Sequence, residues 1–352
     1  MINQIEGKIT NIKYKPLLCS PIPEYNISNL ENAMSNSASF VLRVNDKNRI
    51  AVSWWVSAKR TRSYPYSRVY NTLNFSGKRI TIIPIFKDEG LDGDRDFLQF
   101  DTIALMSLLN VHVIIAYYAT AIKSKNYVNK ITSQRFDNGF ISQKINELIS
   151  NQQSDALHWN MEELTNISEV GRHAIDSYIN ISRKLNVKMS NFERAEERIY
   201  EISKSREHFL SLSRNNAERA QLRESLTTQP KEIVDGTKGI ITIKNYLGGE
   251  YYFTVDETML ISDDVLHLIE AKHCKSENKL PSKDDIKDGL IKMILYTNLE
   301  DVTCNKKNVT TVPSLKLTNA NSRFSLLRKS EIETFELLKK ESEINKFNII
   351  TG

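Results

Sequence analysis

The spacing of hydrophobic residues predicts a mixture of strands and one helix in the first part of the chain. Residues 40–56 are rich in Val, Ile and Trp and predict strands separated by a turn at 45–48. The β-branched run 79–86 predicts another strand. Residues 100–109 have helical spacing, and residues 111–118 have the continuous apolar character of a buried strand.

The middle of the chain has a different pattern. From residue 141 to residue 226 strand signals disappear, and apolar residues recur at helical intervals, as at Ala195, Ile199 and Ile202. Pro230 ends this helical stretch, because proline lacks the amide hydrogen that a helix needs.

The last part returns to strands and then to helices. A helix is predicted to begin near Pro281, with Ser282 and Asp285 in capping positions, and a final amphipathic helix is predicted over residues 330–347. The predicted strands cover residues 240–246, 251–256, 258–261 and 265–273.

These patterns favour an α/β (α+β) protein in three parts. We expect residues 1–136 to form a region of strands and helices, 137–230 a helical linker or dimerisation segment, and 231–352 a mixed sheet flanked by helices.

Composition narrows the class of protein. The chain has 352 residues, 48 basic and 43 acidic, and its three cysteines are too few and too scattered for a disulfide framework or a zinc site. A formal charge of +5 is too small an excess to indicate nucleic-acid binding by itself. The N-terminus lacks the order of a signal peptide and no window has the length of a membrane span, so we expect a soluble, cytoplasmic protein without a membrane partner.

Several classes of site find no support in the sequence. The six histidines are scattered, and there is no Walker A loop or glycine-rich cofactor loop. We therefore expect no nucleotide cofactor, and a methyltransferase is disfavoured.

Three charged residues in the last part predict a catalytic site. Glu270 and Lys272 are two apart and share one face of a strand, while Asp256 ends a preceding strand joined to it by a hairpin. Two carboxylates can hold Mg²⁺ against a phosphate, with the backbone carbonyl of Ala271 as a further ligand. A lysine beside the metal can orient the attacking water and stabilise the transition state.

This Asp…Glu-x-Lys arrangement resembles the PD-(D/E)xK nuclease superfamily, over about sixty residues from Gly239 to Leu299. The order strand, strand, Glu-x-Lys strand and helix is the order of that family's core. Val255 replaces the proline of the pattern, which leaves Glu257, Asp263 and Asp264 as rival first acids. In the alternative interpretation, Glu270 and Lys272 are ordinary exposed charges of a strand. Lys292 and Tyr296 on the following helix either face the site or lie on the helix surface.

A basic and aromatic segment at residues 54–68 predicts contact with DNA, since arginines can bind phosphates and read bases. The alternative is a solvated loop beside two core tryptophans. The residues expected to contact DNA are Lys59, Arg60, Arg62, Tyr64 and Arg68. The acidic stretch Asp88–Asp96 does not fit a calcium-binding loop, because Phe97 and Ile103 stand where that loop needs glycine and glutamate. It is expected to be a structural loop.

The resemblance implies a magnesium-dependent type II restriction endonuclease with a restriction-endonuclease-like core. It implies cleavage of both strands of double-stranded DNA to 5′-phosphate ends, as part of a restriction-modification system. A homodimer is expected, since a palindromic DNA site presents two symmetric halves. A structure-specific repair or recombination nuclease of the same superfamily, and a non-catalytic DNA-binding protein, stay open as alternatives.

Overall fold

The computed structural model divides into two compact units. Unit 1 combines Met1–Pro21 with Arg214–Gly352, and unit 2 is Ile22–Ser213. The structure describes residues 3–58, 63–151, 155–205, 207–209, 211, 237–245, 250–262, 264–277, 279–320 and 327–351. This division differs from the expected three segments, because strand pairing joins the N-terminus to the last part of the chain and the helical middle belongs with the first sheet.

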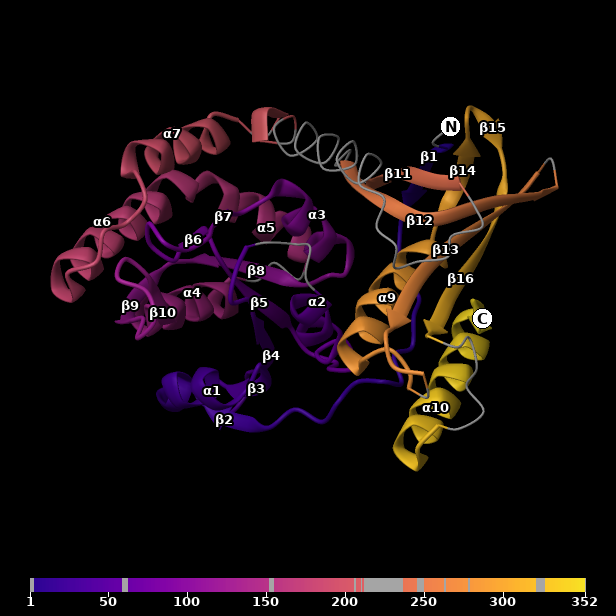
Figure 1. Ribbon diagram of the computed structural model, residues 1–352, viewed down its shortest axis with the longest axis horizontal. Helices are drawn as coiled ribbons and strands as arrows, with labels where there is room; N and C mark the ends of the chain where they lie inside the picture. Colours follow the sequence, from indigo (N-terminus) through magenta and orange to yellow (C-terminus); the bar gives the residue numbers. More distant parts are fainter. Residues whose placement is uncertain are drawn as a thin grey trace. The chain divides into compact units, whose positions relative to one another are not determined.

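The described part of unit 1 contains an eight-stranded mixed sheet in the order β15-β14-β1-β11-β12-β13-β16-β17 (Figure 1). The strands that surround the predicted catalytic residues are β11 (Thr237–Asn245), β12 (Glu250–Ser262), β13 (Val265–Cys274) and β16 (Thr310–Asn319). The other strands are β1 (Asn3–Ile9), β14 (Glu300–Cys304), β15 (Lys307–Asn308) and β17 (Asn348–Thr351).

The centre of this sheet has a simple connectivity. β11, β12 and β13 form consecutive antiparallel pairs. Helix α9 (Lys283–Tyr296) and the β14–β15 hairpin follow, and the chain then enters β16, which is parallel to β13. Helix α10 (Lys329–Asn345) leads on to β17, parallel to β16. β1 pairs with β11 in parallel, and so brings residues more than two hundred positions apart into one sheet.

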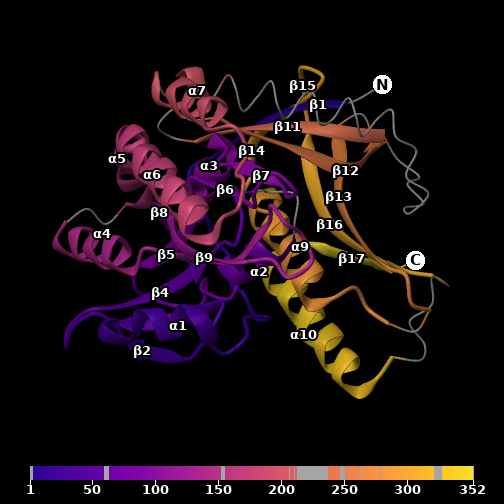
Figure 2. The same ribbon diagram turned by 60° about the vertical axis from the view of Figure 1, so that its left-hand side comes forward.

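Helix α9 begins where the sequence predicts. The Ser282 side chain accepts a hydrogen bond from the Asp285 amide at 3.1 Å, which satisfies one of the unpaired amides at the helix start. Ile286, Leu290 and Met293 are buried where the helix packs against β13 and β16. The turned view in Figure 2 shows α9 and α10 lying alongside the strands of unit 1.

Unit 2 contains a five-stranded sheet in the order β2-β3-β4-β5-β8. Two antiparallel hairpins, β6 with β7 and β9 with β10, adjoin it. The strands are β2 (Glu24–Asn26), β3 (Ser39–Arg43), β4 (Arg49–Trp54), β5 (Arg79–Pro84), β6 (Phe86–Asp88), β7 (Arg95–Phe97), β8 (His112–Ala116), β9 (Tyr118–Lys123) and β10 (Ile131–Phe136).

The helices of unit 2 confirm the helical middle of the chain as far as residue 203. Asp137, Asp155 and Asn191 cap the starts of α4, α5 and α7, each accepting a bond from a backbone amide. The helices are α1 (Leu30–Asn36), α2 (Ser63–Tyr70), α3 (Phe100–Leu108), α4 (Asn138–Ser150), α5 (Ala156–Thr165), α6 (Ile167–Leu185) and α7 (Phe192–Ser203), with a short 3₁₀ turn at Ile27–Asn29.

The two sheets share a connectivity. In unit 2, β3 and β4 are antiparallel, α2 leads to the parallel β5, and α3 lies between β5 and the parallel β8. In unit 1, β12, β13, α9, β16, α10 and β17 have the same order and strand directions, with β14 and β15 inserted after α9 where unit 2 has β6 and β7 inserted after β5. The chain therefore builds one strand-and-helix pattern twice from dissimilar sequences.

Two details differ from the sequence-based expectations, and a third agrees with them. Residues 250–262 form one strand, β12, rather than two, because its pairing with β13 continues past Glu257 and Thr258. Residues 63–70 form a helix rather than a loop, and Pro65 lies in its first turn, where proline is tolerated. The acidic stretch after residue 88 connects the strands of the β6–β7 hairpin.

No helix in the described ranges combines the length and the apolar character that crossing a membrane requires.

Candidate active site

The three predicted catalytic residues lie together on β12 and β13 of unit 1. Glu257 pairs with Ile269 in the antiparallel register, so Asp256 lies beside Glu270. The Ala271 amide donates a hydrogen bond to Asp256 Oδ2 at 3.0 Å and fixes this carboxyl against the neighbouring strand. Lys272 is two residues beyond Glu270 and therefore points to the same face.

Glu270 is the centre of the cluster. Its side chain is buried, with 1% exposed, and Lys272 Nζ lies 2.8 Å from Oε1 while Lys292 Nζ lies 2.7 Å from Oε2. Burial alone would raise the pKa of Glu270, but the two ammonium groups lower it below its ordinary value. Glu270 is therefore an anion held between two cations.

Asp256 has the opposite character. Burial, and then the negative charge of Glu270, raise its pKa to about 7, although Lys292 and Lys272 oppose the rise. The side chain is partly exposed, so solvent reaches it. A carboxyl whose negative charge is this unfavourable gains more than usual from a bound cation.

Helix α9 supplies a second row of polar residues. Asp288, Lys292 and Tyr296 are four apart and so lie on one face of the helix. Lys272 donates a hydrogen bond to Asp288, and Lys292 Nζ also lies 3.3 Å from the Thr254 carbonyl oxygen. The sequence allowed two places for Lys292 and Tyr296, either facing the site or on the helix surface. In the structure both face the site.

Tyr296 carries an unused donor. Its ring stacks on Phe253 with centroids 5.8 Å apart, and its buried hydroxyl has no hydrogen-bond partner among the described residues. Burial, and then the charges of Glu270 and Asp256, raise the pKa of Tyr296, which places the hydroxyl within the electrostatic reach of both carboxylates.

Asp288 was not identified from the sequence, although a signal was present. A surface helix has one apolar face, but α9 has buried Ile286 and Leu290 on one side and buried Leu295 on the opposite side. Asp288 and Lys292 lie in the narrow polar sector beside Leu295, and charges next to so much apolar surface need partners, which this pattern indicated.

The oxygen atoms of the site suit Mg²⁺ better than a metal ion that takes all of its ligands from the protein. In the described part of the chain, no group of three or more His, Cys, Asp or Glu side chains is arranged to hold a metal. Mg²⁺ keeps several waters and takes only one or two carboxylates, and Asp256 and Glu270 provide that number. The backbone carbonyl of Ala271, the residue after Glu270, is a candidate third oxygen ligand.

The rival first acids are placed differently. Glu257 lies on the opposite face of the sheet from Asp256 and pairs with Lys316 at 3.1 Å. Asp264 is exposed and accepts a hydrogen bond from Ser262, while Asp263 lies outside the described residues. The geometry therefore favours Asp256 as the partner of Glu270.

The residues expected to contact DNA are only partly described. Lys59, Arg60 and Arg62 lie outside the described residues, and Tyr64 is described only in its backbone, within α2. Arg68 donates to the Trp54 carbonyl at 2.7 Å and stacks over the Trp54 ring at 4.4 Å. This packing holds α2 against β4.

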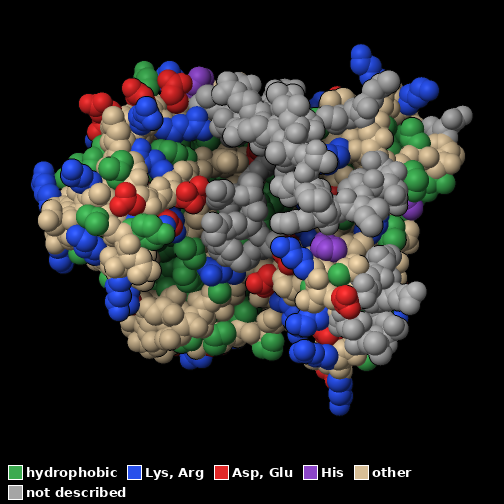
Figure 3. Space-filling view, in the orientation of Figure 1, with side chains coloured by type: hydrophobic (Ala, Val, Ile, Leu, Met, Phe, Trp, Pro, Cys, Tyr) green, Lys and Arg blue, Asp and Glu red, His purple; other side chains and the backbone are tan. Residues whose placement is uncertain are grey.

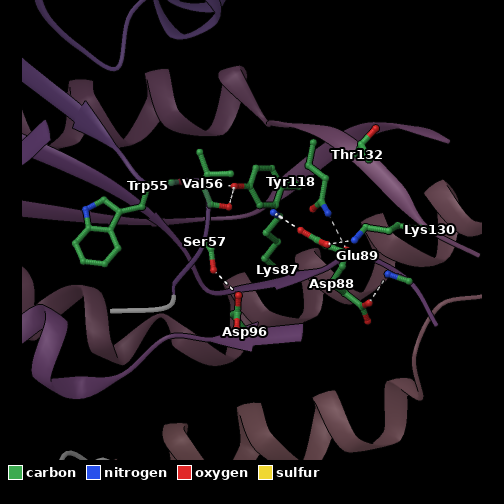
Figure 4. Close-up of polar contacts among 12 residues, drawn as sticks. Trp55, Val56, Ser57, Lys87, Asp88, Glu89, Asp96, Tyr118, Lys130 and Thr132 are labelled. Atoms are coloured by element: carbon green, nitrogen blue, oxygen red, sulfur yellow. Dashed lines mark hydrogen bonds and ion pairs between the residues drawn. The ribbon is translucent and has the colours of Figure 1, made fainter. Parts of the chain in front are cut away.

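The acidic stretch of unit 2 is tied into a structural network (Figure 4). Glu89 bridges Lys87 at 2.7 Å and Lys130 at 2.9 Å, and Ser57 donates to Asp96 at 2.6 Å. Asp88 is fully buried, and it accepts bonds from Arg95 and from the Gly90 amide. These carboxylates connect neighbouring segments of the unit.

The charges on the surface are mixed in sign. On the face shown in Figure 3, Lys and Arg side chains stand among acidic and hydrophobic ones. This agrees with the small excess of positive charge in the whole chain.

Comparisons with protein-family models, with curated proteins and with solved structures found no match to this chain. The functional argument therefore rests on the geometry of the site.

Proposed function

We propose that this protein is a magnesium-dependent DNA endonuclease of the type II restriction class, with its active site in unit 1. One observation carries the proposal. Asp256 and Glu270 lie side by side on paired strands, with the Lys272 ammonium 2.8 Å from Glu270, in a site that is buried yet open to solvent at Asp256. Two carboxylates and a lysine in this arrangement suit phosphodiester hydrolysis.

The connectivity supports the same proposal. β11, β12 and β13 form an antiparallel set, α9 follows, and β16 is parallel to β13. Strand, strand, Glu-x-Lys strand and helix is the order expected for a restriction-endonuclease-like core. Asp256 and Glu270 lie on β12 and β13, the second and third strands of that order.

The side chains have distinct roles in hydrolysis. Asp256, Glu270 and the carbonyl of Ala271 would hold Mg²⁺, which supplies charge neutralisation and lowers the pKa of a bound water. Burial would lower the pKa of Lys272, but Glu270 and Asp288 raise it well above its ordinary value. Lys272 therefore stays protonated at neutral pH, and it orients the attacking water and donates to a phosphate oxygen rather than removing a proton.

The products follow from the direction of attack. Water adds to phosphorus and the 3′-oxygen leaves, which gives a 5′-phosphate and a 3′-hydroxyl. We propose that the enzyme cuts both strands of double-stranded DNA as a homodimer, since a palindromic site presents two symmetric halves. A cognate methyltransferase would then protect the host genome.

The experiment that tests the proposal is cleavage of unmethylated phage DNA by the purified protein, with Mg²⁺ and with EDTA. Wild-type protein should give discrete bands only with Mg²⁺, and Lys272→Ala should give none. Lys316→Met is a matched control, because it breaks a lysine–glutamate pair on the other face of the same sheet and should leave the bands in place.

The outcomes separate the alternatives. A smear of Mg²⁺-dependent products would point to a nuclease without sequence specificity, and a panel of branched substrates would then identify a repair enzyme. Intact DNA in every lane, with the protein folded and bound to DNA, would reject catalysis. Sedimentation as a monomer both with and without DNA would reject the homodimer.

A further inference from the structure

Both oxygens of Glu270 are occupied by ammonium groups. Lys272 Nζ lies 2.8 Å from Oε1, and Lys292 Nζ lies 2.7 Å from Oε2. Since Glu270 is buried, a metal ion that uses this carboxylate meets at least one of these lysines at its ligand atom. A divalent cation and an ammonium group repel each other strongly at contact distance in a buried site. One lysine must therefore move.

The two lysines are held in different ways. Lys272 is bound by a second carboxylate, Asp288, in addition to Glu270. Lys292 is bound to Glu270 and, more loosely, to the Thr254 carbonyl oxygen at 3.3 Å. Lys292 is thus the ammonium with fewer anionic partners in direct contact, and it is the one that can leave at lower cost.

Lys292 is also the lysine associated with the second carboxylate of the pair. Thr254 lies two residues before Asp256 on β12, so the Thr254 and Glu270 contacts hold the Lys292 ammonium between the two strands that carry the acids. Its charge acts on Asp256 more strongly than that of Lys272 does. The ammonium stands where a cation shared by Asp256 and Glu270 would bind.

We propose that Lys292 is a built-in counter-cation of the Asp256–Glu270 pair, and that a divalent metal binds there by displacing its ammonium group from Glu270. The inference rests on the proposed function in one respect, namely that a metal ion binds at Asp256 and Glu270. The proposal predicts that Lys292, which balances negative charge in the metal-free site, also weakens metal binding.

The surroundings allow this exchange. The Lys292 side chain is 22% exposed, so part of it already lies at the surface of unit 1. Its Nζ lies 5.8 Å from the centroid of the Phe253 ring, whose π face can stabilise a cation that has left Glu270. The Tyr296 hydroxyl, which has no hydrogen-bond partner in the part of the chain that the structure describes, gives the vacated region a polar group for a water of the metal shell.

The test is Mn²⁺ binding to the full-length, DNA-free protein, measured by the electron paramagnetic resonance signal of free Mn²⁺. Lys292→Met removes the charge and keeps the length of the side chain. It should bind Mn²⁺ about tenfold more tightly than wild type, because the metal no longer competes with an ammonium group. Lys316→Met, the matched control on the other face of the sheet, should bind as wild type does.

Equal or weaker Mn²⁺ binding by a folded Lys292→Met protein would overturn the proposal. A second measurement uses wild type alone, so that it does not depend on the variant folding. In a crystal structure with Mn²⁺ located by anomalous scattering, the metal should contact Asp256 and Glu270, with Lys292 Nζ out of hydrogen-bonding range of Glu270. A metal bound while that contact persists would also overturn it.

The two proposals fail separately. If wild type cleaves DNA but Lys292→Met gains no affinity for Mn²⁺, the counter-cation is wrong and the nuclease stands. If Lys292→Met gains affinity but wild type cleaves no DNA, the metal exchange stands and the nuclease does not.

Discussion

Lys272 on β13 and Asp288 on α9 are joined by a hydrogen bond between sheet and helix, and Lys272 is bound to Glu270 at the same time. The orientation of this ammonium therefore depends on a helix residue sixteen positions away. Lysine is flexible, and a single partner leaves its head group free to rotate. The Asp288 contact removes that freedom.

We expect Asp288→Asn to lower DNA cleavage about 10–100-fold, the usual effect of removing a residue that orients a catalytic group. The loss should appear in kcat more than in Mn²⁺ affinity, because Asp288 holds the lysine. Single-turnover cleavage with saturating metal measures the rate of the cleavage step, and Mn²⁺ titration measures the metal affinity. Asp284→Asn, at an exposed position one turn earlier on α9, is the control. Equal rates for both variants would remove Asp288 from the site.

The two acids of the site should respond to neutralisation in opposite directions. Glu270→Gln leaves Lys272 and Lys292 without their shared buried anion and should lower the free energy of unfolding by about 3 kcal/mol. Asp256→Asn should raise it by about 1 kcal/mol at pH 8, because it removes a charge that burial and Glu270 disfavour. Both variants should be inactive.

Urea denaturation followed by far-UV circular dichroism measures these changes. A loss of stability in Asp256→Asn equal to that in Glu270→Gln would mean that the two acids are not the unequal pair that the structure describes. Glu257→Gln, in the ion pair on the other face, controls for breaking a buried salt bridge without touching the site.

The parts of the fold that were predictable have local causes. Ser282 and Asp285 indicated the start of α9 because a helix cap is made by residues three apart in sequence. Glu270 and Lys272 were placed on one face because the period of a strand is two. The acid on the preceding strand followed from the hairpin that joins β12 and β13.

The missed parts depend on contacts between distant residues. β1 is parallel to β11, and nothing in Asn3–Ile9 encodes a partner more than two hundred residues away. The interruption predicted in β12 fell at Glu257, which is charged but is buried by pairing across strands. Asp288 went unnoticed because carboxylates and lysines four apart on a helix usually form exposed surface pairs.

Gly289 on α9 lies beside the stem of Lys272, the lysine that the proposed function places in the active site. A Cβ atom at this position would lie 2.7 Å from Leu315 Cδ1 and 3.3 Å from Lys272 Cε, so the helix and β16 would have to separate slightly. We expect Gly289→Ala to lose about 1 kcal/mol of stability, since overpacking exceeds the gain in helix propensity.

The same substitution should lower cleavage by more than the stability loss explains, because the added methyl group displaces the stem of Lys272. Activity measured well below the melting temperature separates the two effects. Gly139→Ala in α4, where a Cβ would approach only Asp137 Oδ1 at 3.3 Å, should leave activity unchanged. Full activity of Gly289→Ala would show that Lys272 tolerates displacement.

His112 provides a pH-dependent test in unit 2. The ring is buried at the start of β8; Nδ1 lies 3.2 Å from the Arg79 carbonyl oxygen, and Nε2 has no hydrogen-bond partner among the described residues. The pKa of His112 is lowered to about 4, mainly by burial and to a lesser extent by the charges of Lys78 and Arg79, while the hydrogen bond to the Arg79 carbonyl and the charge of Asp155 oppose this shift. The folded protein therefore resists protonation of this ring.

The sign of the pH effect follows. Above pH 6.5 the imidazole is neutral in both the folded and the unfolded state, so it does not change stability with pH. Between pH 6.5 and pH 4 the imidazole binds a proton in the unfolded chain but not in the folded chain. The free energy of unfolding therefore falls by about 3 kcal/mol in total as the pH is lowered through this range. His112→Phe should remove this part of the dependence of stability on pH.

Tryptophan fluorescence can follow the stability of unit 2 by itself. All three tryptophans, Trp54, Trp55 and Trp159, lie in this unit, so urea unfolding followed by their fluorescence at several pH values reports on it. Subtracting the variant's curve from that of wild type isolates His112 from the carboxylates that titrate in the same range. Parallel curves for the two proteins would show that His112 is not the group that is held neutral.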